Sequence, residues 1–451
     1  MSNLRPILTR ILAIALVAVL PAEAASQGAP VFDRALELAS FDTAWTRVRD
    51  SYYDASMRGL DWNALRDSLR PMVARGESRA DTRAAITALL SRLGESHFGI
   101  IPGDAMSVVA PTGLSGRAGD LGVEVRFIDS TLVVTRIDAR TPAHEAGMRP
   151  GWIVDAIDTL RVLDALRATA SVTAPAARRF AQVRLTLMLN SILSGPAGGS
   201  IRLAVRDADD RARDLDVVLR ETPGQLVEFG ALPPLHVRFA HQRIPGPDGC
   251  IGVIRFNTFM TPVMPQYQDA MGELADCRGV VLDLRGNLGG LGAMVIGMSG
   301  HVFAEPETLG TMRMREATMR YIARPVQVTR TGQPARPYDG PVAIVVDELS
   351  ASTTEILAAA WQQLGRARVF GVPSAGQALP ALLTPLPNGD RLMYVVADFT
   401  GPHGTRVEGA GVVPDVLIPR SRPALLAGRD ESLEAAIAWA RQVPRGGSTP
   451  D

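Results

Sequence analysis

A glycine-rich stretch at the end of an apolar run is the first candidate for chemistry. Residues 283–290 read Asp-Leu-Arg-Gly-Asn-Leu-Gly-Gly and end the strand-like run GVVLDL. Glycines here let the backbone turn sharply and leave N–H groups free to stabilise an oxyanion or to bind phosphate. Phosphate binding is disfavoured because the GxGxxG spacing and any lysine are missing. Taken alone, the stretch also fits a plain turn.

Ser352 is the second candidate. It lies in LSASTTEI, between the strand-like run PVAIVVD and the helical run TEILAAAWQQLG. Ser352-x-x-Glu355 has the form of a capping box, in which the serine only starts a helix. A nucleophile would suit the same place, because a helix N-terminus favours developing negative charge. These residues alone favour the cap.

The basic residues restrict the possible mechanisms. All 47 are arginine, so a Schiff base or a serine–lysine dyad is excluded. The formal net charge of +0 argues against nucleic acid or an anionic membrane surface as a partner. No metal site and no cofactor is predicted.

The two cysteines, Cys250 and Cys277, each precede a strand-like run, and a helical segment at 264–274 separates them. A strand–helix–strand unit places two parallel strands side by side with their starts together. A disulfide between them is therefore plausible in an oxidising compartment, and two buried free thiols are the alternative.

The remaining chain supplies the elements that must position these residues. Residues 1–24 have a positive start, an apolar run and the small-x-small site Ala22-Glu23-Ala24, which predicts a cleaved signal peptide. We therefore expect a periplasmic or secreted protein without a stable membrane anchor. The 451 residues favour two or three domains. Helical periodicity over 25–105 predicts a small helical domain.

Residues 106–222 change to short strands and resemble a PDZ domain in the stretch TPAHEAGMRPGWIVDAID. The resemblance implies that a peptide C-terminus binds at the loop Gly119-Asp120-Leu121-Gly122 and adds a strand to the domain. The stretch 162–193 is longer than this family usually carries. A purely structural PDZ domain is the alternative.

Strands alternate with helices over 223–425, as in an α/β fold with parallel strands, and a C-terminal helix and tail follow over 426–451. The ordered motifs DLRGNLGG, VVDELSASTTEILAAA, GRARVFGVPSAG and RVEGAGVVPD resemble the C-terminal-processing and tricorn serine peptidase superfamily. This resemblance implies a crotonase/ClpP-like peptidase core with Ser352 as nucleophile. It also implies an oxyanion hole made by the N–H groups of Thr353 and of Gly289 or Gly290.

The general base distinguishes the two branches of that superfamily. Gln377 stands where processing proteases carry their lysine, and an amide cannot accept the serine proton. The tricorn branch uses a histidine preceded by a serine, together with a distant glutamate. The matching residues here are Ser96, His97 and Glu408, with His403 as a second candidate for the base.

The sequence thus predicts a serine-type peptidase that acts on polypeptide substrates, including their C-terminal tails. Two alternatives stay open: a degenerate exported peptide-binding protein, and a small-molecule hydrolase or carrier on the same core.

Overall fold

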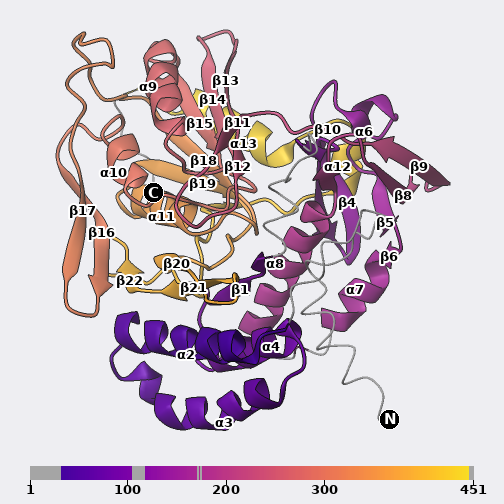
Figure 1. Ribbon diagram of the computed structural model, residues 1–451. Coiled ribbons are helices and arrows are strands. Elements are labelled where there is room, and N and C mark those ends of the chain that lie inside the picture. Colours follow the sequence, from indigo (N-terminus) through magenta and orange to yellow (C-terminus); the bar gives the residue numbers. More distant parts are fainter. Residues whose placement is uncertain (1–31, 104–116, 170–171, 173–174, 446–451) are drawn as a thin grey trace.

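The computed structural model describes residues 32–103, 117–169, 172 and 175–445. The predicted signal peptide lies outside these residues. None of the described helices is long and apolar enough to cross a bilayer. Helices α2–α4, a sheet-rich unit and a larger α/β part follow one another along the chain (Figure 1).

A six-stranded sheet forms the centre of the α/β part. In spatial order its strands are β13 (Phe239–Ile244), β14 (Ile251–Phe256), β15 (Gly279–Asp283), β18 (Val342–Val346), β19 (Ala367–Gly371) and β23 (Val416–Leu417). Only β13 is antiparallel to its neighbour. The predicted parallel α/β arrangement is therefore present.

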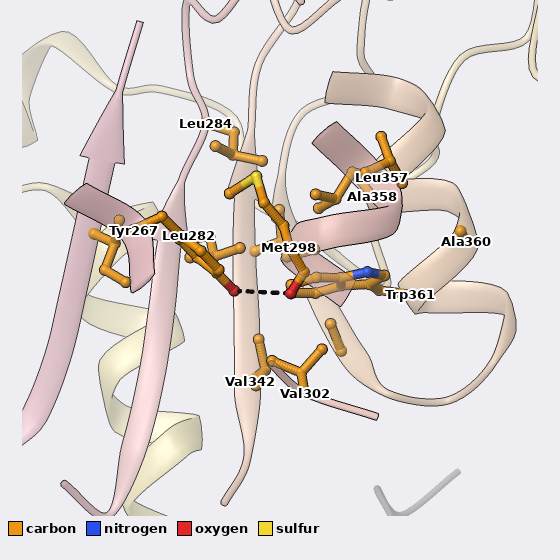
Figure 2. Packing of buried hydrophobic residues seen from close by; sticks show 14 of the residues in the cluster. Tyr267, Leu282, Leu284, Met298, Val302, Val342, Leu357, Ala358, Ala360 and Trp361 are labelled. Carbon is orange, nitrogen blue, oxygen red and sulfur yellow. Dashed lines mark hydrogen bonds between the residues drawn. The ribbon is translucent and has the colours of Figure 1, made fainter. Parts of the chain in front are cut away.

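Successive side chains of a strand point to opposite faces of the sheet, and in these strands both sets are apolar. Helices therefore cover both faces. Leu282 packs toward α9 (Val263–Glu273), α10 (Met294–Ser299) and α11 (Thr353–Gln363), as Figure 2 shows. The neighbouring Val281 packs toward α13 (Glu431–Gln442) on the other face.

The N-terminal helices share a core with a strand pair from the far end of the chain. They are α2 (Arg34–Ser51), η1 (Met57–Gly59), α3 (Trp62–Arg75) and α4 (Arg79–Ser91). Their apolar side chains pack on β21 (Arg391–Val395) and on Leu379 and Leu386, which flank β20 (Ala381–Pro385). Strand β1 (Gly99–Ile101) pairs with β21, and β21 pairs with β20. The predicted helical region is present, but it packs directly against the α/β part.

The sheet-rich unit follows the predicted order. Its main strands are β3 (Val123–Ile128), β4 (Thr131–Ile137), β5 (Ile153–Ile157), β6 (Leu160–Arg161), β8 (Ser200–Arg206) and β9 (Ala212–Val218). Asp129 and Ser130 take positive φ in the β3–β4 turn, as a tight hairpin requires. Short helix α6 spans Pro142–Glu145, and the expected helical stretch divides into α7 (Val162–Thr169) and α8 (Pro175–Ser191).

The other strands form small sheets around these parts. They are β2 (Ala118–Asp120), β7 (Ser194–Pro196), β10 (Arg220–Glu221), β11 (Gln225–Val227), β12 (Leu235–Val237), β16 (Glu307–Met314), β17 (Thr318–Ala323) and β22 (Ala397–Thr400). Strand β2 lies between β7 and β10, and β16 lies between β17 and β22.

The predicted boundary at residue 425 stays a prediction. It falls inside α12 (Arg422–Leu426), whose Leu426 packs on the core of the sheet-rich unit. The following helix α13 buries Ala436 and Ala440 against the central sheet. The apolar side of α13 explains this placement, since it completes the core of the α/β part.

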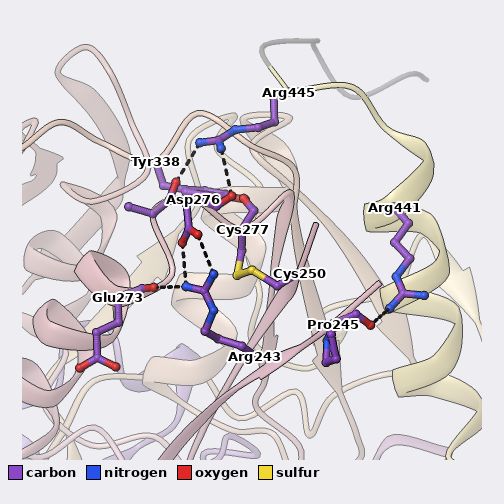
Figure 3. Close-up of a disulfide and its surroundings, with 10 residues drawn as sticks. Arg243, Pro245, Cys250, Glu273, Asp276, Cys277, Tyr338, Arg441 and Arg445 are labelled. Atoms are coloured by element: carbon purple, nitrogen blue, oxygen red, sulfur yellow. Dashed lines mark hydrogen bonds and ion pairs between the residues drawn. A yellow bond between two sulfur atoms is a disulfide. The ribbon is translucent and has the colours of Figure 1, made fainter. Parts of the chain in front are cut away.

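Cys250 and Cys277 form a disulfide between the starts of β14 and β15 (Figure 3). The bond connects residues 27 positions apart. Nearby, the side chains of Arg243 and Asp276 form an ion pair at 2.6 Å. The disulfide thus closes the β14–α9–β15 unit at the amino ends of two neighbouring strands of the central sheet.

Replacing both cysteines, as Cys250→Ala with Cys277→Ala, should lower the free energy of unfolding by about 3.5 kcal/mol. A closed loop of this length restricts the unfolded chain by roughly that amount. Urea unfolding followed by circular dichroism measures the change, with reduced wild type as the comparison. An unchanged urea midpoint would show that the bond adds no stability.

Candidate active site

Ser352 begins α11 in a backbone conformation that is rare for a residue with a side chain. Its φ is 58° and its ψ is −121°. Its N–H donates to the carbonyl of Gln377 at 2.8 Å and to the carboxylate of Glu355 at 3.0 Å. A sharp strand-to-helix turn of this kind places a serine side chain at the carboxyl end of the sheet, as a nucleophile requires.

Glu355 does more than cap this helix. Its buried carboxylate also accepts hydrogen bonds from Ser374 Oγ at 2.5 Å, from Gly376 N–H at 2.6 Å and from Gln377 N–H at 2.8 Å. Burial raises the pKa of Glu355 to about 7, and these hydrogen bonds oppose the rise. The carboxylate therefore ties the 374–377 segment to the Ser352 turn.

Ser96, His97 and Glu408 form one hydrogen-bonded series. Ser96 Oγ donates to Glu408 Oε2 at 2.9 Å and lies 2.8 Å from His97 Nδ1. The Ser96 N–H donates to Glu408 Oε1 at 3.0 Å. Since the Ser96 hydroxyl gives its proton to the carboxylate, it accepts from Nδ1–H of His97. The other ring nitrogen, Nε2, is then the one left unprotonated.

The electrostatic environment of this series favours neutral imidazole. Part of the His97 surface stays exposed. Even so, the loss of hydration on burial disfavours the charged ring and lowers the pKa of His97 to about 4. Burial also raises the pKa of Glu408. His97 has a positive φ of 58°, so both it and Ser352 have left-handed backbone conformations.

Two consecutive residues connect this series to the serine. The carbonyl of Gln377 accepts from the Ser352 N–H at 2.8 Å, and the Ala378 N–H donates to Glu408 at 2.8 Å. The structure therefore links Ser352 to the Ser96–His97–Glu408 series through the Gln377–Ala378 segment, although 255 positions separate Ser352 from His97.

The glycines after β15 lie directly against the serine. A Cβ on Gly289 would fall 2.7 Å from Ser352 Cβ and 2.8 Å from Thr353 N, so only glycine fits. The N–H of Gly289 already donates to Asn287 Oδ1 at 2.9 Å. In the described part of the chain, the N–H groups of Gly290 and Thr353 have no such acceptor. Of the two predicted glycines, Gly290 is thus the one with a free donor.

Two ion pairs that the sequence analysis missed lie next to the site residues. Glu95, next to Ser96, accepts from Arg406 at 2.6 Å. Asp347 accepts from Gly286 N–H at 2.8 Å and from Arg126 of β3 at 2.9 Å, and the arginines around it hold its pKa well below the usual range. The position of Glu95 beside the Ser-His pair is the one sequence signal that could have found the first pair.

Other predicted site residues lie elsewhere. Gly119 and Asp120 belong to β2, flanked by two strands, while Leu121 is buried and Gly122 has a positive φ. Peptide binding by these four residues stays a prediction. His403 is exposed, and its backbone N–H donates to Gln363 Oε1 at 3.4 Å.

Comparison with known proteins identifies the class of enzyme. Residues 250–418 match Peptidase family S41, and residues 38–90 match the Tricorn protease C1 domain. The homologues are serine peptidases, so the chain is a serine-type peptidase rather than a receptor or a carrier.

The individual relatives are distant but cover most of the chain. Carboxyl-terminal-processing peptidase 2, chloroplastic, of Arabidopsis thaliana is 25% identical over 93% of this chain and 76% of the relative. Tricorn protease homolog 1 of Streptomyces coelicolor is 26% identical over 89% of this chain and 34% of the relative. The solved photosystem II D1 C-terminal processing protease has the same fold, with a TM-score of 0.57 at 21% identity over 91% of this chain and 97% of its own.

The stability of the folded chain should depend on pH through Glu355. A carboxyl whose folded pKa is raised to about 7 stabilises the fold at low pH, and that contribution is lost as the pH rises through 7. The loss is on the order of 3 kcal/mol. Glu355→Gln lacks this titration, so its deficit in melting temperature against wild type should narrow between pH 5 and pH 8. A deficit that stays constant or widens over this range would contradict the raised pKa.

Proposed function

We propose that this chain cleaves peptide bonds through an acyl-enzyme on Ser352, with His97 as general base. The observation that supports this most directly is the series Glu408–Ser96–His97 beside the Ser352 turn, in a chain without lysine. A serine needs base assistance worth roughly two to four orders of magnitude in rate at neutral pH. His97 offers the assistance that Gln377 cannot.

The proposed reaction follows the general pattern of serine peptidases. Nε2 of His97 takes the proton of the Ser352 hydroxyl while Oγ attacks the scissile carbonyl carbon. The N–H groups of Gly290 and Thr353 bind the oxyanion. The imidazolium then protonates the leaving amine, and the C–N bond breaks. Water, deprotonated by His97, hydrolyses the ester and restores the serine.

Ser96 and Glu408 act through His97 rather than on the substrate. The Ser96 hydroxyl keeps Nδ1 protonated, so that Nε2 faces the reaction as a base. Glu408 orients Ser96 through two hydrogen bonds and provides negative charge near the imidazolium that forms. This division of roles resembles the histidine-using tricorn branch.

The finer parts of the proposal concern substrates and location. We take the 106–222 region as PDZ-like and the 223–425 region as a crotonase/ClpP-like core. Polypeptides, including C-terminal tails, are the proposed substrates. The disulfide and the N-terminal signal pattern both support export to the periplasm or beyond.

Ser352→Ala should abolish labelling by a fluorophosphonate probe, and His97→Ala should slow it by about two to four orders of magnitude. Gln377→Ala is the matched control. It should label at close to the wild-type rate, because Gln377 binds Ser352 and Glu355 through its backbone. If His97→Ala is labelled as fast as wild type while Gln377→Ala is not labelled, His97 is not the general base.

The pH profile provides a second test. With the pKa of His97 lowered to about 4, the imidazole stays neutral well below its usual range. The labelling rate should therefore hold from pH 8 to about 5.5 and fall only at lower pH. A labelling rate that already falls around pH 6.5, in wild type and in Glu355→Gln alike, would show that burial does not lower the pKa of His97.

A further inference from the structure

Helix α8 makes two contacts that have no part in the proposed mechanism. It contacts β3 of the sheet-rich unit near its C-terminal end and the turn after Glu408 near its N-terminal end. Arg179 and Asn190 make these two contacts. They are eleven residues apart, about three helical turns and roughly 16 Å, and therefore lie on one face of the helix.

At one end, Asn190 occupies the free edge of a strand. β3 is the outermost strand of its sheet and pairs only with β4. On its other side, the Val125 N–H donates to Asn190 Oδ1 at 3.0 Å, and Asn190 Nδ2 donates to the Val125 carbonyl at 3.0 Å. A peptide that adds to this edge would need these same two backbone groups. The amide of Asn190 thus takes the place of one residue of an added strand.

At the other end, Arg179 holds the turn that carries Glu408. Its Nη1 donates to the Ala410 carbonyl at 3.0 Å. Its Nη2 lies against Gly411, where an added Cβ would approach it to 2.9 Å and Ser374 Oγ to 2.8 Å. Ser374 in turn donates to Glu355. Arg179 therefore touches the segment that places Glu408 and packs beside the residues that hold the Ser352 turn.

We propose that α8 is a strap, fixed by Asn190 on the peptide-accepting edge of β3, and that Arg179 at its other end is a positioning residue for Glu408. Two consequences follow. The β3 edge is occupied by the chain itself, so a peptide can add there only when α8 leaves. Such a peptide also loosens the Glu408 turn. The second consequence rests on the proposed function, because it concerns the orientation of Ser96 and His97.

Single substitutions test each end of the strap. Arg179→Ala should lower the fluorophosphonate labelling rate about tenfold, as expected for the loss of a hydrogen bond from a charged donor. Arg179→Lys, which keeps a charged donor, should restore most of the rate. Arg178→Ala is the matched control, since Arg178 binds Val172 instead of the catalytic turn. Equal losses in Arg178→Ala and Arg179→Ala would overturn the positioning role.

A double-mutant cycle tests whether the two ends act together. Independent sites so far apart are additive. A strap predicts that Asn190→Ala alone slows labelling about as much as Arg179→Ala, and that the double variant is no slower than either. Additive losses, or an Asn190→Ala rate equal to that of wild type, would overturn the proposal.

Hydrogen exchange separates this proposal from the proposed function, because it needs no activity. In Asn190→Ala the amides of Gly409 and Gly411 should exchange faster, although they lie at the far end of α8 from the substitution. Gln182→Ala, an exposed position on the same helix, should leave them unchanged. Unchanged exchange in Asn190→Ala would overturn the strap even if the enzyme is active. If wild type resists the probe while exchange responds as expected, the proposed function fails and the strap stands.

Discussion

The buried carboxylate of Glu355 is the constraint on which the catalytic region depends. A carboxylate without partners in a protein interior is very costly, so the four groups that donate to it cannot leave without a large penalty. Those donors come from the start of α11 and from the segment after β19. Two loops that follow separate strands are thereby held as one body. The unusual backbone of Ser352 persists because this body surrounds it.

The same arrangement explains why glutamine can stand at position 377, where processing proteases carry a lysine. Gln377 serves the site through its backbone, donating to Glu355 and accepting from Ser352, so its side chain is free to change. The base then has to come from another part of the chain. The proposed base, His97, follows N-terminal helices that share a hydrophobic core with β21 and with Leu379 and Leu386 on either side of β20. The Glu95–Arg406 pair and the Ser96–Glu408 bonds complete the connection.

Local patterns predicted the elements well, because periodicity and caps report on neighbouring residues. Asp61 and Ser78 cap α3 and α4, and the strands of the central sheet follow the apolar runs. The role of Glu355 was not predictable in this way. Its spacing from Ser352 matches a capping box, and nothing local shows that three further donors converge on it. The packing of α13 was not predictable locally either, because it depends on a sheet whose first strand, β13, begins at Phe239.

Two carboxylates act in parallel at this site. Glu355 accepts from the N–H of Ser352, and Glu408 accepts from the N–H of Ser96, the residue before His97. Glu355 therefore anchors the left-handed Ser352, and Glu408 anchors the residue before the left-handed His97. Such conformations cost on the order of 1–3 kcal/mol each. Gln377 and Ala378 connect the two anchors, since the first donates to Glu355 and the second to Glu408. The relative position of the proposed nucleophile and base thus depends on two adjacent peptide groups. A lysine at position 377 is not needed in this arrangement, because Gln377 takes part through its backbone and the proposed base is His97.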